Sequence, residues 1–282
     1  MTDGGIILET RHLRKDFAAL RAVDDVSIQV RQGTLHSIIG PNGAGKTTLF
    51  NLLSGTLKPT AGQVLFKGQD ITRLSDTRRS HLGIGRSFQI TNIFPNLTAL
   101  ENVRIAAQSR GHDSLKLWRH YRHYHRYEER ARAILAEVGL AGKELLIAGL
   151  LPHGDQRKLE IAILLATEPE LLLLDEPTSG ISREEVPAIL EVIGRIRARG
   201  DKTIMLVEHK MDIVMGTSDV VTVMHLGNVI AEGTPAEIAS NEAVQNAYLG
   251  GLYKEAMQDA LAKKVGSGQR SVVSGQQAGG RG

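Results

Sequence analysis

The chain of 282 residues is 41% hydrophobic and 23% charged, proportions typical of globular proteins that bury a core. It has no cysteine, which excludes disulfides, thiolate nucleophiles and cysteine metal sites. An aromatic content of 4% and a net charge of +3 are too low to indicate a nucleic-acid partner. No apolar run approaches the roughly 20 residues of a membrane span, so work at a membrane would need a partner protein.

The first part of the chain predicts strands around a glycine-rich loop. Residues 6 to 31 alternate apolar and polar side chains, as half-exposed antiparallel strands do. The apolar run Leu35 to Ile39 predicts a buried strand, and Thr47 to Leu53 predicts a helix. The loop pattern Gly, four residues, Gly-Lys-Thr is matched without a mismatch by Gly40-Pro41-Asn42-Gly43-Ala44-Gly45-Lys46-Thr47-Thr48.

This strand–loop–helix arrangement suits a phosphate ligand. Successive backbone N–H groups curl around a phosphate, and the helix N-terminus adds its partial positive charge. Glycine at positions 40, 43 and 45 allows the turns and keeps a Cβ away from the oxygens. Lys46 supplies a charge for the β- and γ-phosphates, and the Thr47 hydroxyl is a candidate Mg²⁺ ligand. We therefore predict that the chain binds a nucleoside triphosphate.

The middle of the chain changes from strands to helices. Gln63 to Phe66 predicts one strand, and Leu82 to Phe88 predicts another that ends at Gln89. From Thr98 to about Leu140 the pattern is helical, and a second helix is expected from about Asp155 to Thr167.

Within the first helical stretch, His120, His123 and His125 invite comparison with a metal site. At helical spacing only His120 and His123 share a face, and no carboxylates match their spacing. A solvated basic helix face is the favoured interpretation.

The last part of the chain alternates short apolar strands with helices. Leu171 to Leu174 and Thr203 to Val207 predict strands buried on both faces, separated by a helix over residues 183–199. Val220 to Met224 and Val229 to Ala231 predict a hairpin, which two short helices follow. From residue 264 the tail is rich in Gly, Ser and Gln, and we expect it to be disordered.

Polar residues at the ends of these strands add chemistry to the phosphate loop. Asp175 and Glu176 directly follow an apolar strand, where the carboxyl edge of a parallel sheet binds ligands. Asp175 would orient Mg²⁺, and Glu176 would polarise the attacking water. Gln89 ends a strand and could reach the metal and the water, while His209 could donate a hydrogen bond to the γ-phosphate.

In the order GPNGAGKTT, SFQ, LPHGDQRKLEIA, LLLLDEPT and VEH, these motifs resemble the nucleotide-binding subunits of ATP-binding cassette (ABC) transporters. The resemblance covers about residues 6 to 250. It implies an α/β fold with a P-loop NTPase (RecA-like) core, an N-terminal antiparallel β subdomain and an inserted α-helical subdomain at about residues 90–165. The ABC ATPase domain would span residues 6–253, and residues 254–282 would form a C-terminal extension, largely disordered.

The resemblance also implies roles for single residues. Phe17 would stack on adenine, the alternative being a core aromatic of the N-terminal sheet. Gln89 would couple the site to the membrane partner, and Asp175 would serve Mg²⁺. Glu176 would be the catalytic base, and His209 would sense the γ-phosphate.

One motif departs from the family pattern. The signature, normally Leu-Ser-Gly-Gly-Gln, is replaced by Leu151-Pro152-His153-Gly154-Asp155. In the family this segment closes over ATP held by a second subunit in a head-to-tail dimer. The serine hydroxyl is lost here, and Asp155 brings a negative charge that the N–H of His153 is expected to offset. The loop 179–182 also lacks the usual aspartate.

The variant signature narrows the resemblance to ATPases of branched-chain amino acid importers. It implies ATP and Mg²⁺ as cofactors, a second ATPase subunit, and two permease subunits that residues 90–101 would touch. A periplasmic solute-binding protein would act indirectly, and no nucleic acid would take part. The subunit would be peripheral, on the cytoplasmic face of the inner membrane.

Other functions stay open at this stage. Urea or amide uptake, export of lipid or polysaccharide, and a non-transport ABC ATPase share much of the motif set. A phosphate-loop GTPase is disfavoured because the chain has no Asn/Thr-Lys-x-Asp base-reading motif.

Overall fold

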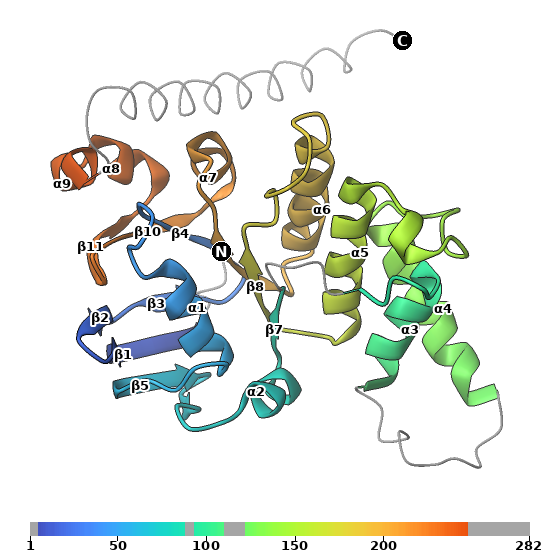
Figure 1. The fold of residues 1–282 in the computed structure, drawn as a ribbon, viewed down its shortest axis with the longest axis horizontal. Helices are drawn as coiled ribbons and strands as arrows, with labels where there is room; N and C mark the ends of the chain where they lie inside the picture. The colour runs from blue at the N-terminus through green and yellow to red at the C-terminus, as the bar shows by residue number, and fades with distance from the viewer. Residues whose placement is uncertain (1–4, 88–92, 110–121, 248–282) are drawn as a thin grey trace, which may run out of the picture.

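The computed structural model describes residues 5–87, 93–109 and 122–247. Two sheets lie on either side of the helix α1 (Lys46–Ser54), and a group of helices lies beside the larger sheet (Figure 1). None of the helices in these ranges is both long and apolar enough to cross a membrane.

The smaller sheet is antiparallel and comes from the N-terminal part of the chain. β1 (Ile6–Phe17) pairs with β2 (Leu20–Val26), β3 (Gln29–Arg31) and β5 (Ala61–Phe66), and β5 pairs with β6 (Gln69–Asp70). Its inner face buries Leu8, Leu13 and Val64 against α1. The alternation over residues 6–31 therefore predicted the strands correctly, although the run Val26 to Val30 is divided between β2 and β3.

The larger sheet has the strand order β11-β10-β4-β9-β8-β7. All neighbours are parallel except β10 and β11, which form the expected hairpin. The strands are β4 (Leu35–Ile39), β7 (Ile84–Arg86), β8 (Leu171–Asp175), β9 (Thr203–Val207), β10 (Val220–His225) and β11 (Asn228–Gly233).

The central strands separate two cores. Leu172 and Leu174 of β8 belong to the core formed with the helical part of the chain between residues 99 and 198. Leu171 and Leu173 face the other side, toward α1 and the antiparallel sheet. Every residue of β4, β8 and β9 is buried, because both faces of these strands are covered. This is why β8 and β9 are almost continuously apolar rather than alternating, whereas β4 also buries the polar residues His36 and Ser37.

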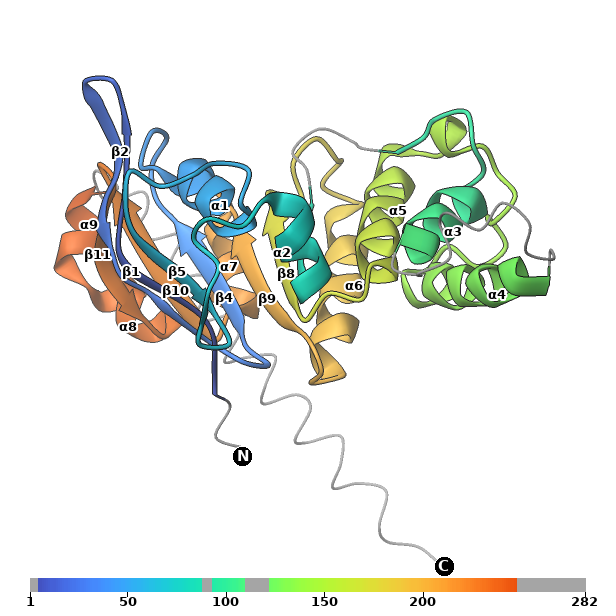
Figure 2. The same ribbon diagram turned by 90° about the horizontal axis from the view of Figure 1, so that it is seen from below.

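Helices cover the larger sheet and extend from it. Figure 2 shows α3 (Ala99–Ser109) and α4 (Arg122–Glu137) far from the antiparallel sheet, with α5 (His153–Ala166) between them and the larger sheet. A 3₁₀ turn, Ala148–Leu150, precedes α5. The remaining helices are α6 (Val186–Ala198), α7 (Met211–Thr217), α8 (Pro235–Ser240) and α9 (Glu242–Ala247).

Several predicted boundaries were wrong. The strand expected from Leu82 begins at Ile84, because the unpredicted helix α2 (Asp76–Leu82) runs up to Gly83, which ends it at a φ of 110°. The helix α7 was also missed, since its seven residues are too few to show a periodic pattern. The helix α5 begins at His153, two residues before its predicted start, because Pro152 serves as its N-cap. The predicted disordered tail lies outside the described residues.

Tyr127 corrects the interpretation of the histidine-rich stretch. Its side chain is 5% exposed and packs in the core formed with α3 and α5, so this part of α4 is not a wholly solvated face. His120 and the side chain of His123 lie outside the described residues.

A buried histidine lies in the centre of the larger sheet. His36 of β4 is 1% exposed, and its Nε2 lies 2.7 Å from the Thr222 hydroxyl of β10. That hydroxyl donates its single hydrogen to the Glu232 carboxylate at 2.7 Å, so Nε2 of His36 must carry a proton and donate. Burial lowers the pKa of His36 from its ordinary value of 6.5 to about 4.

This shift predicts a loss of stability in mild acid. Below about pH 6.5 the unfolded chain protonates this histidine, whereas the folded chain does so only near pH 4, so unfolding becomes easier as the pH falls. Between about pH 7 and pH 5 the free energy of unfolding should drop by about 2 kcal/mol from this residue alone. Urea titrations at the two pH values should show a smaller drop for His36→Gln, which retains an N–H donor without titrating.

His12→Asn is the matched control, since the His12 side chain is 82% exposed. It should leave the pH dependence of unfolding close to that of the parent protein. An equal drop in the parent and in His36→Gln would contradict the assignment to His36.

Candidate functional site

The glycine-rich loop lies at the carboxyl end of β4, with α1 beginning directly after it at Lys46. Gly40, Gly43 and Gly45 all have positive φ, as expected for turns that favour glycine. At Gly45 an added Cβ would lie 2.3 Å from the carbonyl oxygen of Ala22, and at Gly40 one would lie 2.2 Å from that of Met224. The backbone of the loop is therefore pressed between β2 and β10, and only glycine fits at these two positions.

Lys46 is folded back onto this loop. Its Nζ donates to the carbonyl oxygens of Gly40, at 2.7 Å, and Pro41, at 3.0 Å. Burial lowers the pKa of this ammonium, and the nearby carboxylates of Glu176 and Asp175 act in the opposite direction. Among the described residues this buried ammonium donates its hydrogen bonds to neutral carbonyls, so it is well placed to take an anionic ligand.

The two predicted carboxylates lie at the end of β8, against which α1 packs. Asp175 is fully buried, which raises its pKa, while the Arg86 guanidinium 3.2 Å from Oδ2 counteracts this shift. Among the described residues, Oδ1 of Asp175 has no hydrogen-bond partner. An unpaired buried carboxylate oxygen, next to a loop that begins a helix with Lys46 and Thr47, fits the oxygen donors that Mg²⁺ prefers.

Glu176 has an unusual backbone and a close partner. Its φ of 49° is in the left-handed region, which is costly for a side chain with a Cβ and is held here by the bond from its N–H to the Val207 carbonyl. Its Oε1 lies 2.5 Å from Nε2 of His209, which follows β9. The structure thus brings together Lys46, Asp175, Glu176 and His209 at one edge of the larger sheet.

Two residues that the sequence did not single out hold this arrangement. Arg157 of α5 donates to the carbonyl oxygens of Glu176 and Pro177, both at 3.1 Å. Glu208 accepts a 2.6 Å bond from the Thr178 hydroxyl, which ties the loop after β8 to the loop after β9. Both lie within quoted motifs, Arg157 in LPHGDQRKLEIA and Glu208 in VEH. The motifs gave neither residue a role, because each acts across elements that are distant in sequence.

The signature-like segment caps and begins α5. Leu151 is buried, Pro152 and His153 are exposed, and the Gly154 N–H donates to Oε1 of Glu185 at 3.0 Å. A Cβ on Gly154 would lie 2.6 Å from that oxygen. Glu185 also accepts from the Ser182 N–H, and these backbone bonds hold its pKa below the usual range. The carboxylate from the loop before α6 therefore caps a helix that has no capping side chain of its own.

The charge of Asp155 is neutralised differently from the prediction. Nζ of Lys143 lies 2.5 Å from one carboxylate oxygen and Nζ of Lys158 3.3 Å from the other. Burial by itself would raise the pKa of Asp155, but these two ammonium groups outweigh it and lower the pKa. The expectation that His153 offsets this charge was wrong, because two lysines do so.

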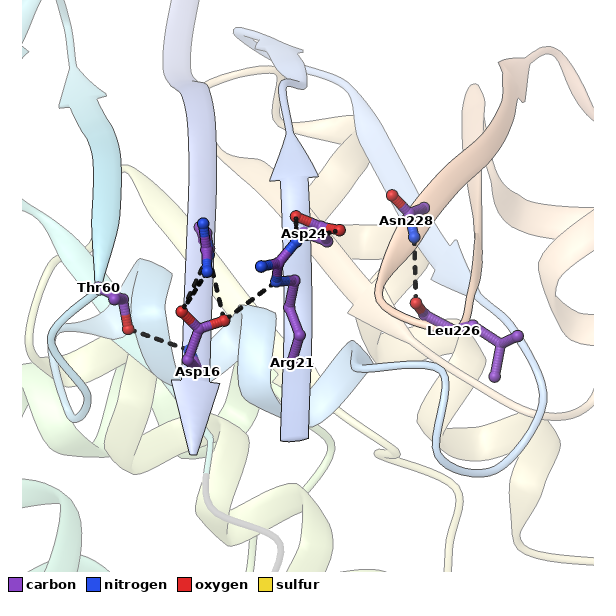
Figure 3. A network of polar contacts seen from close by, with 7 residues as sticks. Asp16, Arg21, Asp24, Thr60, Leu226 and Asn228 are labelled. Atoms are coloured by element: carbon purple, nitrogen blue, oxygen red, sulfur yellow. Dashed lines mark hydrogen bonds and ion pairs between the residues drawn. The ribbon is translucent and has the colours of Figure 1, made fainter. Parts of the chain in front are cut away.

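Phe17 lies at the end of β1 with 43% of its surface exposed, which excludes the alternative of a core aromatic. Polar contacts anchor the hairpin around it, as Figure 3 shows. Asp16 accepts from Arg21 at 3.2 Å, and its N–H donates to the Thr60 hydroxyl at 3.0 Å. The Asp24 N–H donates to the Gly227 carbonyl at 2.8 Å. The N–H of Gly227 in turn donates to the Ala44 carbonyl of the phosphate loop, so the β1–β2 hairpin that carries Phe17 and the phosphate loop are both bonded to Gly227.

Gln89 lies outside the described residues. The chain leads toward it from Arg86 and Ser87, which line a cleft of about 410 Å³ between α2, β7 and α5. In the part of the chain that the structure describes, no group of three or more His, Cys, Asp or Glu side chains could hold a metal ion.

Comparison with known proteins decides the family. A family model described as "ABC transporter" matches residues 23–179, which include the phosphate loop, the signature segment and the carboxylate pair. The chain belongs to the ABC transporter ATPase family. A second model, described as "Branched-chain amino acid ATP-binding cassette transporter", matches residues 228–253.

Individual relatives of this ABC ATPase match almost over their full length. The high-affinity branched-chain amino acid transport ATP-binding protein LivG of Salmonella typhimurium is 38% identical over 249 residues, 86% of this chain and 98% of the relative. BraF of Pseudomonas aeruginosa, with the same description, is 37% identical over equal shares.

Among solved structures, the ADP conformation of an ATP-binding cassette of an ABC transporter has a TM-score of 0.75 at 31% identity. It covers 88% of this chain and 100% of that one. The chain therefore has the P-loop NTPase fold of these cassettes, and it binds and hydrolyses ATP.

The Glu185 contact leads to a prediction about stability. Glu185→Ala removes the carboxylate that caps α5 and leaves the Gly154 N–H without this acceptor, so the melting temperature should fall by a few degrees. Thermal unfolding followed by circular dichroism measures the change. Glu184→Ala is the matched control, because the adjacent glutamate is exposed and should be nearly neutral. Equal effects of the two substitutions would show that the cap contributes nothing.

Proposed function

We propose that this ABC ATPase is the ATP-hydrolysing motor subunit of an importer for branched-chain amino acids or a related small polar solute. The observation that carries the proposal is the grouping of Lys46, Asp175, Glu176 and His209 beside the phosphate loop, in a chain similar to LivG and BraF over almost their whole length. Urea or amide uptake remains the closest alternative solute class.

In this proposal the phosphate loop, residues 40–48, holds the triphosphate, and Lys46 leaves its two carbonyl partners for the phosphates. Thr47, Asp175 and Gln89 would hold Mg²⁺, which neutralises phosphate charge when it is bound. Phe17 stacks on the adenine ring.

Glu176 acts as the general base on the attacking water. His209, 2.5 Å from Glu176, orients that carboxylate and contacts the γ-phosphate. The strained backbone of Glu176 supports this role, since such strain is concentrated at functional sites.

A second ATPase subunit would complete the site. The segment Leu151–Asp155 would close over ATP held by that subunit in a homodimer or heterodimer, with the Gly154 N–H exchanging Glu185 for a phosphate oxygen. Because Asp155 is already paired with two lysines, its charge opposes such an anion less than the sequence suggests. The dimer would close only when ATP is bound, and the free-energy difference between the open and closed dimers would drive the conformational change of the permeases.

The permease contact would lie at the cleft lined by Arg86 and Ser87 and along residues 90–101. Phe94 in this segment is 54% exposed, as an interface residue would be before assembly. The domain would span residues 6–253, with the helical part at about 90–165 and an extension at 254–282. Two permeases would hold the subunit on the cytoplasmic face of the inner membrane, and a periplasmic binding protein would deliver the solute.

Glu176→Gln tests the proposed chemistry. Loss of the general base should lower the ATPase rate at least about a hundredfold, while ATP still binds. Phosphate release and nucleotide binding are measured on the purified protein. Glu184→Gln is the control and should retain the parental rate. A Glu176→Gln variant with more than a tenth of that rate would contradict the assignment.

Co-purification tests the proposed partners. The tagged subunit, isolated from membranes in mild detergent, should bring down two permeases and a second ATPase subunit. The binding protein that belongs to them should bind a branched-chain amino acid. Recovery of a ribosome or DNA complex instead would contradict the transporter function, and recovery with an exporter permease would contradict the importer function.

A further inference from the structure

Arg86 connects three parts of the site that the motifs treat separately. It is the last residue of β7, and its side chain is 13% exposed. Its Nη1 donates to Oδ1 of Asn51 at 2.5 Å and to the Ser54 hydroxyl at 2.9 Å, both on α1. Its Nη2 donates to Oδ2 of Asp175 at 3.2 Å, on β8.

This geometry holds one oxygen of Asp175 and leaves the other available. Oδ1 has no hydrogen-bond partner among the described residues, whereas Oδ2 faces the guanidinium. The backbone around the carboxylate is held as well, since the Asp175 N–H donates to the Ser87 hydroxyl at 3.1 Å and the Ser87 N–H to the Leu173 carbonyl at 2.9 Å. Arg86, the last residue of β7, and Ser87, which follows it, therefore determine where Asp175 lies and which way it points.

The same guanidinium is anchored on the helix that begins with Lys46 and Thr47. Asn51 and Ser54 lie in the later turns of α1, and a nine-residue helix is rigid over that distance. Arg86 thus sets the separation between Asp175 and the helix that carries the proposed hydroxyl ligand. A planar guanidinium can bond two groups on one side and a carboxylate on the other at once, which a lysine ammonium on a flexible stem does not do with the same geometry.

We propose that Arg86 is a positioning residue for the Mg²⁺–nucleotide site, which orients Asp175 and fixes it relative to α1. This inference rests on the proposed role of Asp175 in holding Mg²⁺. Arg86 touches neither nucleotide nor metal in this assignment, and it acts through Asp175. Since it also lines the cleft at α2 and α5, the residue that orients the carboxylate is within reach of whatever occupies that cleft.

The test measures how much Mg²⁺ strengthens nucleotide binding. ADP affinity is determined by calorimetry in Mg²⁺ and in EDTA, on the parent protein and on Arg86→Gln. Substitutions next to metal ligands commonly cost 10- to 100-fold in metal affinity, so the gain from Mg²⁺ should fall at least about tenfold. Affinity in EDTA should stay within about twofold of the parent, because the phosphate loop is unchanged. Because the Mg²⁺-dependent part of nucleotide binding is weakened, the KM for Mg²⁺–ATP should rise in Arg86→Gln.

Two further variants separate positioning from simple destabilisation. Arg86→Lys retains the charge without the fork, so it should lose a smaller part of the Mg²⁺-dependent gain. Arg79→Gln is the matched control, since Arg79 is 1% exposed and donates to the carbonyl oxygens of Leu52 and Leu53, also on α1, at 2.7 and 2.8 Å. It should lower the melting temperature but leave the gain from Mg²⁺ at the parental value.

Asp175→Asn distinguishes failure of this inference from failure of the proposed site. If Mg²⁺ strengthens ADP binding in Asp175→Asn as much as in the parent protein, the proposed metal role of Asp175 is overturned. If Mg²⁺ no longer strengthens ADP binding in Asp175→Asn but still strengthens it to the parental extent in both Arg86 variants, only the inference about Arg86 is overturned. An equal loss of affinity in EDTA and in Mg²⁺ for Arg86→Gln would show a structural role alone and would overturn the inference as well.

Discussion

The burial of Asp175 is the constraint on which the rest of the site depends. A carboxylate with no exposed surface is costly unless cations and donors surround it, and burial raises its pKa. The structure meets this cost with Arg86 on one oxygen and with the ammonium of Lys46 nearby. The other oxygen is left unpaired among the described residues. In the proposed Mg²⁺–nucleotide complex, the arriving cation and phosphate would stabilise such a site further.

The position of that carboxylate follows from the two cores on either side of the larger sheet. Alternate residues of β8 pack against the helices and against α1, so the strand cannot slip by one residue without exchanging its faces. Asp175 and Glu176 are consequently delivered at the same edge as the phosphate loop. Hydrophobic packing sets the register of β8, and this register places the two carboxylates beside the phosphate loop. The hydrogen bonds of Arg86, Arg157 and Glu208 then orient the Asp175 side chain and the loop that follows β8.

The signature segment shows how a departure from a family pattern is accommodated locally. Asp155 stands where an uncharged residue is usual, and Lys143 and Lys158 surround it. Pro152 and His153 provide no capping hydroxyl, and the Glu185 carboxylate occupies the end of α5 instead. Both compensations keep the helix N-terminus stable in the single subunit. In the proposed dimer, Glu185 would have to yield its place to the ligand of the second subunit.

Much of this protein was predictable from local pattern: the phosphate loop, the buried strands β4, β8 and β9, and the carboxylates at a strand end. These features can be recognised in the sequence because a phosphate loop and a buried strand each require particular residue types at consecutive positions. The short helices α2 and α7, the start of α5 and the partners of Asp155 were not predictable. Only folding brought Arg86 to Asp175, 89 residues away, and Glu185 to Gly154, 31 residues away. Contacts of this kind leave no periodic pattern in the sequence, because a single side chain from any neighbouring element can make them.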